Sequence, residues 1–179
     1  MFKSKIDETK AFIPLGIAVL AVSDTRTFET DTSGALLKEM IERDGHRVVE
    51  RATVKDDKAA IAAVVKAWAA DSEIDVIITT GGTGFAKRDV TPEAIEPLFD
   101  KRMEGFSVLF HQYSAQNIGT STLQSRATAG LIGETLVFCL PGSRGACRDG
   151  WEGILKHQLD ARHLPCNFIE IIPRLANKS

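Results

Sequence analysis

A short run of glycines and hydroxyl residues near the middle of the sequence has the composition of a phosphate-binding loop. It reads Thr80-Gly81-Gly82-Thr83-Gly84 and directly follows the apolar segment Ile74–Thr79. Glycine lets the backbone approach a ligand closely and point several N–H groups at a phosphate oxygen. The run lacks the GxGxxG pattern of dinucleotide sites and the lysine of a P-loop. It therefore predicts an anion-binding loop of another kind, with an ordinary turn as the alternative.

Aspartates are expected close to this loop. Asp89 follows Gly84 by five positions, and the adjacent pair Asp56 and Asp57 begins the helix after the predicted strand that ends at Val54. Magnesium is commonly held by one or two carboxylates together with substrate phosphate oxygens and water. The pattern therefore indicates a Mg²⁺ site beside a bound phosphate. The alternatives are a helix cap for Asp56 or Asp57 and a turn for Asp89.

Two further polar segments are candidates for the same site. Pro141-Gly142-Ser143 lies between an apolar segment and a helical pattern, where backbone N–H groups favour an anion, although proline is also an ordinary way to end a strand. A polar cluster of four hydroxyl residues and one arginine in residues 119–127, called the hydroxyl cluster below, has two interpretations, a contact of its hydroxyls to a heterocycle or a solvated linker. The cluster consists of Thr120, Ser121, Thr122, Ser125 and Arg126.

The apolar segments that precede these loops predict an α/β fold. Leu15–Val22 is continuously apolar, as a strand covered on both faces of a parallel sheet is, Ile74–Thr79 is another buried strand, and His46–Val54 is a short strand. Helical stripes separate the strands, the first with a cap near Asp31 and a stop at Gly45. We predict a three-layer, doubly wound, mostly parallel sheet with its ligand crevice beyond the carboxyl ends of the strands.

The middle of the chain is expected to be largely helical. Thr91 and Pro92 fit the N-cap and the first residue of a helix, because proline has no N–H to leave unpaired there. The helical pattern is expected to break near Gly105 and to end near Ala115.

The last third of the chain is expected to complete the sheet. Apolar segments at residues 125–132 and 135–140 flank a turn and predict an antiparallel hairpin at the edge of the sheet. An amphipathic helix follows, and Phe168–Ile172 is expected to add an edge strand. We predict a single α/β domain over residues 15–179, preceded by a loosely held N-terminal arm at residues 1–14.

The overall composition excludes several classes of protein. Lys and Arg number 22 against 24 Asp and Glu, so the formal net charge of −2 argues against a protein that coats nucleic acid or an anionic membrane. No apolar run approaches the roughly 20 residues that span a bilayer, and the start has no signal-peptide pattern. The three cysteines suggest neither a disulfide framework nor a zinc ribbon. We expect a cytoplasmic protein.

Four segments together resemble the molybdenum cofactor biosynthesis family that includes the molybdopterin adenylyltransferases. They are ITTGGTG at 78–84, RDVTPEA at 88–94, GTSTLQSRA at 119–127 and LPGS at 140–143. The third segment, together with Ala146-Cys147-Arg148, Leu159–Arg162 and Pro165–Phe168, is similar to the B branch of the family. The resemblance covers roughly Leu15 to Phe168, which is most of the chain.

The resemblance implies a molybdopterin-binding α/β domain that forms homotrimers or homohexamers and contacts other proteins of the pathway. In catalytic members, the terminal phosphate of molybdopterin attacks the α-phosphorus of ATP in the presence of Mg²⁺, giving adenylylated molybdopterin and pyrophosphate. The implied substrates are ATP and molybdopterin, and the implied cofactor is Mg²⁺. The alternative is a non-catalytic molybdopterin-binding or scaffold oligomer in the same pathway.

The resemblance also implies roles for individual residues. Asp56 and Asp89 match the two functional aspartates of the family, as catalytic residues and Mg²⁺ ligands, with a one-residue ambiguity left by Asp57. Some B-branch sequences lack one or both aspartates, and this chain has both. Three loops match substrate-binding segments: Ser23 and Asp24; Thr80, Gly81, Gly82, Thr83 and Gly84; and Pro141, Gly142 and Ser143.

Overall fold

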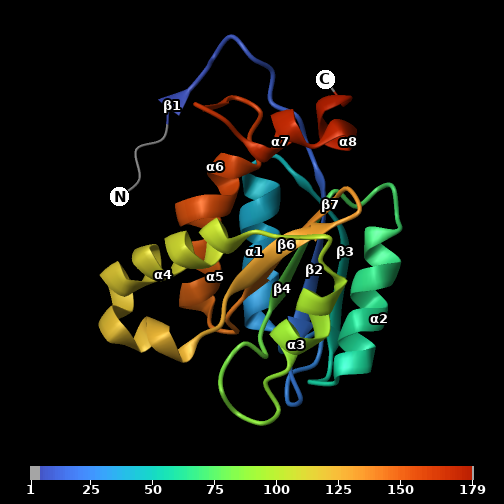
Figure 1. The fold of residues 1–179 in the computed structure, drawn as a ribbon, viewed down its shortest axis with the longest axis vertical. Helices are drawn as coiled ribbons and strands as arrows, with labels where there is room; N and C mark the ends of the chain where they lie inside the picture. Colours follow the sequence, from blue (N-terminus) through green and yellow to red (C-terminus); the bar gives the residue numbers. More distant parts are fainter. Residues whose placement is uncertain (1–4, 179) are drawn as a thin grey trace.

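This computed structural model describes residues 5–178, in which a six-stranded sheet lies between helices (Figure 1). The strands are β2 Gly16–Val22, β3 Arg47–Val54, β4 Val76–Thr80, β5 Lys101–Arg102, β6 Thr128–Ile132 and β7 Thr135–Leu140. Their order is β3-β2-β4-β7-β6-β5; the first four are parallel, β6 is antiparallel to β7, and β5 is antiparallel to β6. The predicted mostly parallel sheet with an antiparallel hairpin is confirmed.

Helices cover both faces of the sheet, which completes the predicted three layers. The main helices are α1 Thr32–Arg43, α2 Lys58–Ala69, α3 Thr91–Ile95, α4 Glu104–Ile118 and α5 Arg144–Gly150. The α1, α4 and α5 helices pack on one face, and α2 and α3 pack on the other. Strand β2 sends Ile17 and Val19 to the first face and Ala18 and Leu20 to the second, and all four are buried. Burial on both faces explains why this strand shows no alternation of polar and apolar residues.

The predicted helix after Pro92 is interrupted earlier than expected. A short 3₁₀-helix, η1 (Glu96–Leu98), and β5 separate α3 from α4, so the prediction of a break at Gly105 is wrong: Gly105 lies inside α4, which continues to Ile118. Thr91 is also not the N-cap. It is the first helical residue, and its hydroxyl donates to the Gly81 carbonyl at 2.8 Å instead of capping the helix.

The C-terminal segment is helical where an edge strand was expected. After α5 the chain continues through a π-helix, η3 (Trp151–Leu155), α6 (Lys156–Gln158) and the short strand β8 (His163–Leu164). Residues 168–172 then form α7 (Phe168–Ile171), followed by α8 (Pro173–Ala176). The Asn167 side chain accepts a hydrogen bond from the Glu170 amide at 3.2 Å, and this cap starts a helix where apolar content alone suggested a strand.

The two ends of the described chain lie on the same side of the molecule (Figure 1). Strand β1 (Lys5–Ile6) pairs antiparallel with β8, and residues 1–4 of the predicted arm lie outside the described residues. The C-terminal segment is tied to the sheet through the fully buried Asp75, which accepts hydrogen bonds from the Gly16 amide and from Lys178. Asp75 also lies 3.7 Å from the Arg174 guanidinium. No helix within residues 5–178 is long and apolar enough to cross a membrane.

Removal of the Asp75 carboxylate is expected to destabilise the fold. In Asp75→Ala, two basic side chains and the Gly16 amide lose their common acceptor, and such a loss costs about 3 kcal/mol in the free energy of unfolding. Asp75→Asn keeps an acceptor for the Gly16 amide and should lose less. Urea unfolding of both variants tests this expectation, and equal losses would contradict the assigned role of the amide contact.

Candidate functional site

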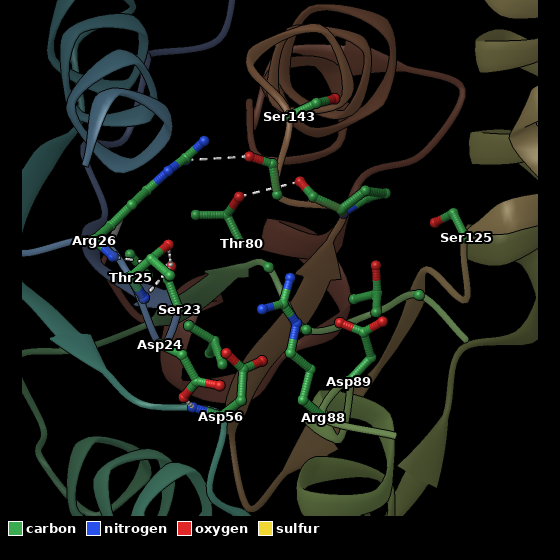
Figure 2. Close-up of a pocket in the computed structure, with 18 of the residues that line it drawn as sticks. Ser23, Asp24, Thr25, Arg26, Asp56, Thr80, Arg88, Asp89, Ser125 and Ser143 are labelled. Atoms are coloured by element: carbon green, nitrogen blue, oxygen red, sulfur yellow. Dashed lines mark hydrogen bonds between the residues drawn. The ribbon is translucent and has the colours of Figure 1, made fainter. Parts of the chain in front are cut away.

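The carboxyl ends of the four parallel strands meet around a pocket with a volume of about 430 Å³ (Figure 2). The strand order reverses at β2, because the next strand in the chain, β3, lies on one side of β2 and the strand after that, β4, lies on the other. Such a switch point is where open α/β sheets bind ligands. The catalytic, metal-binding and substrate-binding residues that the family resemblance implied all line this pocket: Ser23, Asp24, Asp56, Thr80, Gly81, Gly82, Thr83, Gly84, Asp89, Pro141, Gly142 and Ser143.

The glycine loop after β4 has a backbone that other residues would strain. Gly81 and Gly82 have φ angles of +105° and +65°, which are unfavourable for side chains with a Cβ. A Cβ on Gly81 would lie 2.2 Å from the Val22 carbonyl oxygen, and one on Gly82 would lie 2.3 Å from the Thr91 hydroxyl. These two positions therefore accept only glycine without rearrangement.

The same loop presents unpaired backbone donors. Within residues 5–178, the N–H groups of Gly82, Thr83 and Gly84 have no hydrogen-bond acceptor. Successive backbone N–H groups at such a turn can bind an anion. These three donors are therefore available for the phosphate that the sequence predicts at this loop.

Three carboxylates face the pocket next to this loop (Figure 2). They belong to Asp24, Asp56 and Asp89, and none of them forms an ion pair with a described lysine or arginine. Burial raises the pKa of Asp56 above its ordinary value of 3.8, and the nearby Asp24 and Asp89 carboxylates raise it further. Arg88 lines the same pocket and acts in the opposite direction on the pKa of Asp56, but it forms no ion pair with any of the three carboxylates and does not offset the increase.

The structure separates the adjacent aspartates. Asp56 lines the pocket, whereas the Asp57 side chain caps α2 by accepting a hydrogen bond from the Ala60 amide at 2.8 Å. The backbone amide of Asp56 donates to Asp24 Oδ1 at 3.2 Å, which joins the loops after β2 and β3.

The carboxylates suit a metal ion that takes its remaining ligands from water and from a bound phosphate. The described residues contain no group of three or more His, Cys, Asp or Glu side chains arranged to hold a metal ion without further ligands. Magnesium commonly takes only one or two carboxylates and keeps water and phosphate oxygens as its other ligands. Asp56 and Asp89 beside a phosphate-binding loop fit that donor set.

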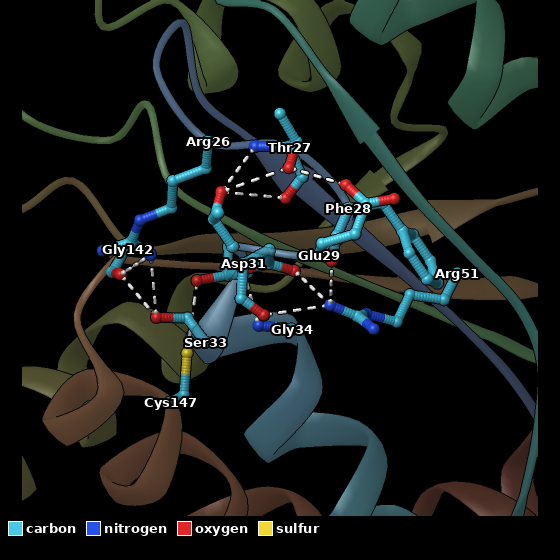
Figure 3. A network of polar contacts seen from close by, with 12 residues as sticks. Arg26, Thr27, Phe28, Glu29, Asp31, Ser33, Gly34, Arg51, Gly142 and Cys147 are labelled. Carbon is cyan, nitrogen blue, oxygen red and sulfur yellow. Dashed lines mark hydrogen bonds and ion pairs between the residues drawn. The ribbon is translucent and has the colours of Figure 1, made fainter.

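The loop after β7 is tied to the rest of the pocket through its carbonyl groups. The Thr80 hydroxyl donates to the Pro141 carbonyl at 3.1 Å, and the buried Ser33 hydroxyl donates to the Gly142 carbonyl at 2.8 Å (Figure 3). The Ser143 hydroxyl accepts from the Ala146 amide at 3.1 Å and caps α5. This loop is therefore held from three directions.

The hydroxyl cluster predicted for a heterocycle is only partly at the pocket. Ser125 lines it, but Thr122 is buried and forms a 2.8 Å hydrogen bond with His111 Nδ1. Thr120 and Ser121 do not line the pocket. The 3₁₀-helix η2 (Gly119–Gln124) turns these side chains in different directions, which composition could not reveal.

Arg126 holds the glycine loop in position through hydrogen bonds to its carbonyl groups. Its Nε donates to the Gly84 carbonyl and its Nη2 to the Asp89 carbonyl, both at 2.9 Å, and its backbone amide donates to the Thr83 carbonyl at the same distance. It also forms an ion pair with Glu93. Arg126 thereby fixes both ends of the segment that carries Asp89.

Sequence reasoning missed several residues that line the pocket. They are Thr25, Arg26, Arg88 and Gln124, together with Asp31. Arg26 follows the first predicted loop and Arg88 precedes Asp89, so their position after strand ends was a usable signal. The direction of a long side chain in a loop, however, depends on contacts from distant parts of the chain.

The raised pKa of Asp56 predicts a gain in stability when its charge is removed. Asp56→Asn should raise the free energy of unfolding at neutral pH, because the folded state disfavours this carboxylate. The gain should vanish as the pH falls below 3.8, where Asp56 is protonated in both the folded and unfolded states. Chemical unfolding of Asp56→Asn and the parent from pH 3 to 8 tests this, and a pH-independent difference would contradict the electrostatic cause.

Comparison with known proteins identifies the family. The family model described as a probable molybdopterin binding domain matches residues 18–161. The chain is 52% identical over 157 residues to molybdenum cofactor biosynthesis protein B of Escherichia coli, covering 88% of this chain and 92% of that protein. It is 49% identical over 146 residues to the protein of the same name from Staphylococcus carnosus, covering 80% and 85% of the two chains.

Solved structures agree with the sequence comparison. A crystal structure of molybdenum cofactor biosynthesis protein B superposes with a TM-score of 0.81 at 38% identity, covering 94% of this chain and 98% of that one. The tungsten cofactor synthesizing protein from Pyrococcus furiosus superposes with a TM-score of 0.71 at 38% identity, covering 79% and 90%. Matched in sequence, in fold and across most of its length, the chain belongs to the molybdopterin-binding family of molybdenum cofactor biosynthesis proteins, in its B branch.

Proposed function

We propose that this protein is a Mg²⁺-dependent molybdopterin adenylyltransferase that transfers AMP from ATP to the terminal phosphate of molybdopterin. One observation carries the proposal. Unpaired carboxylates and unpaired backbone N–H groups line the same pocket, at the switch point of the sheet. Carboxylates alone would repel a polyphosphate, so this combination favours a phosphate substrate that arrives with a divalent cation.

In the proposed reaction, an oxygen of the molybdopterin phosphate forms a bond to the α-phosphorus of ATP. The bond between the α-phosphorus and the bridging oxygen to the β-phosphorus breaks, and pyrophosphate leaves with that electron pair. Because a phosphate monoester is largely ionised at neutral pH, the attacking oxygen needs no general base. The protein then contributes mainly position and neutralisation of charge.

The residues divide these tasks. The N–H groups of Gly82, Thr83 and Gly84 donate to phosphate oxygens and fix the nucleotide against the strand end. Asp56 and Asp89 would hold Mg²⁺, which when bound neutralises charge on the phosphates and orients the leaving group.

The direct test is pyrophosphate release by the purified protein with ATP and Mg²⁺, in the presence and absence of molybdopterin. The proposal predicts release that depends on both molybdopterin and Mg²⁺. Molybdopterin binding without any release would instead support the alternative of a non-catalytic carrier or scaffold. Release that is independent of molybdopterin would contradict the assigned acceptor.

A further inference from the structure

One arginine of the pocket is anchored but not neutralised. Arg26 lies in the loop after β2, and its Nη1 donates to the Ser33 hydroxyl at 3.2 Å and to the Gly142 carbonyl at 3.4 Å (Figure 3). It therefore bridges the loop after β2 and the loop after β7. Within residues 5–178, its Nε and Nη2 have no acceptor and its guanidinium has no carboxylate partner.

The loop that carries Arg26 is held firmly at its far end. Arg51 of β3 donates to the carbonyl of Asp31 at 2.9 Å and to that of Phe28 at 3.2 Å, and it forms an ion pair with the buried Asp31 carboxylate at 3.1 Å. The Arg51 guanidinium also lies 4.3 Å from the centre of the Phe28 ring. Arg26 is thus presented by a loop that is ordered before any ligand binds, which limits the entropy lost on binding.

Charge is distributed unevenly in the pocket. In the view of Figure 2, Arg26 points to the loop that carries Ser143, whereas Asp24 and Asp56 lie on the other side of Thr80. The pocket is lined by four acidic side chains and by two arginines, Arg26 and Arg88. Arg88 lies beside Asp56 and Asp89 and acts electrostatically on Asp56, whereas Arg26 has no carboxylate partner among the described residues. A guanidinium that is held in place but has no carboxylate partner can bind a phosphate, because its remaining N–H groups can donate to the phosphate oxygens.

We propose that Arg26 binds the attacking phosphate monoester of the acceptor directly, without metal, and so determines that the acceptor must end in a phosphate. The inference rests on the proposed adenylyl transfer. In that reaction the attacking and leaving oxygens lie roughly in line on opposite sides of the α-phosphorus. A metal at the carboxylates serves the nucleotide phosphates, and the acceptor phosphate then needs a separate cation, which Arg26 supplies.

The test measures binding in two separate arms. In the first arm, molybdopterin is titrated into the protein in EDTA without nucleotide; in the second, ATP with Mg²⁺ is titrated without molybdopterin. Arg26→Met should weaken molybdopterin binding about tenfold to hundredfold, as expected for loss of a charged hydrogen bond, and leave the ATP arm unchanged. Arg26→Lys should restore part of the lost affinity, because lysine keeps the charge but not the planar set of donors.

Arg148→Met is the matched control, because Arg148 is exposed on α5 and does not line the pocket. It should change neither arm. Equal weakening of both arms by Arg26→Met would overturn the proposal in favour of a purely structural bridge, and weakening of the ATP arm alone would assign Arg26 to the nucleotide. Both arms are independent of turnover, so absence of pyrophosphate release by the parent protein would contradict the proposed function without deciding this assignment.

Discussion

Asp89→Asn is expected to lower turnover about a hundredfold to a thousandfold while the fold remains intact. The neutral amide cannot provide the charged ligand that Mg²⁺ prefers, so charge on the phosphates is no longer neutralised. The fold should survive because Asp89 is only partly buried and its structural contact is a hydrogen bond from the Ala86 amide at 2.9 Å, which an asparagine oxygen also accepts. Steady-state pyrophosphate release and thermal unfolding measure the two effects separately.

Asp57→Asn provides the control for this experiment. Asp57 carries the same charge, lies beside Asp56 in the sequence and caps α2 outside the pocket. Asparagine is an equally good N-cap, so both turnover and stability should stay close to those of the parent. If Asp89→Asn and Asp57→Asn had the same activity, the assignment of Asp89 to the site would be wrong.

Arg126→Met is expected to lower kcat about tenfold to a hundredfold, because a small displacement of positioned groups has an effect of that size. The substitution removes the side-chain donors that hold the carbonyls of Gly84 and Asp89. Asp89 would then be free to move relative to the glycine loop. The Mg²⁺ concentration needed for half-maximal activity should rise, which a general loss of stability would not produce.

Glu93→Gln is the comparison for Arg126→Met. It removes the ion pair with Arg126 but leaves the bonds from Arg126 to the two backbone carbonyls. Because the ion pair is partly exposed, its loss should have a small effect on kcat and on the Mg²⁺ requirement. An equal effect of the two substitutions would show that the ion pair, and not the hydrogen bonds to the loop, determines kcat and the Mg²⁺ requirement.

The parts of the fold that follow from local pattern could be predicted from the sequence. β2 is continuously apolar and β4 begins with three apolar residues because helices cover both faces of the sheet, and this pattern located the loops at their carboxyl ends. Since parallel strands end at one edge, the residues after them were expected to meet, and the structure brings them together in one pocket.

Other features depend on contacts between residues far apart in the sequence, so they could not be predicted from local sequence pattern. Arg126 is more than 35 residues from Asp89, and Ser33 is 109 residues from Gly142, yet these pairs fix the loops. The C-terminal error had a local signal that was overlooked. Asn167 followed three residues later by Glu170 is a capping pattern, and it outweighs the β-propensity of the isoleucines in α7.

The most direct test follows the α-phosphate of ATP. The protein is incubated with Mg²⁺, molybdopterin and ATP labelled at its α-phosphate, and the products are separated and identified by mass. The account predicts that the label moves to molybdopterin as AMP, with one pyrophosphate released for each transfer. Label that stays in ADP or free AMP while molybdopterin remains unmodified would contradict adenylyl transfer by this pocket.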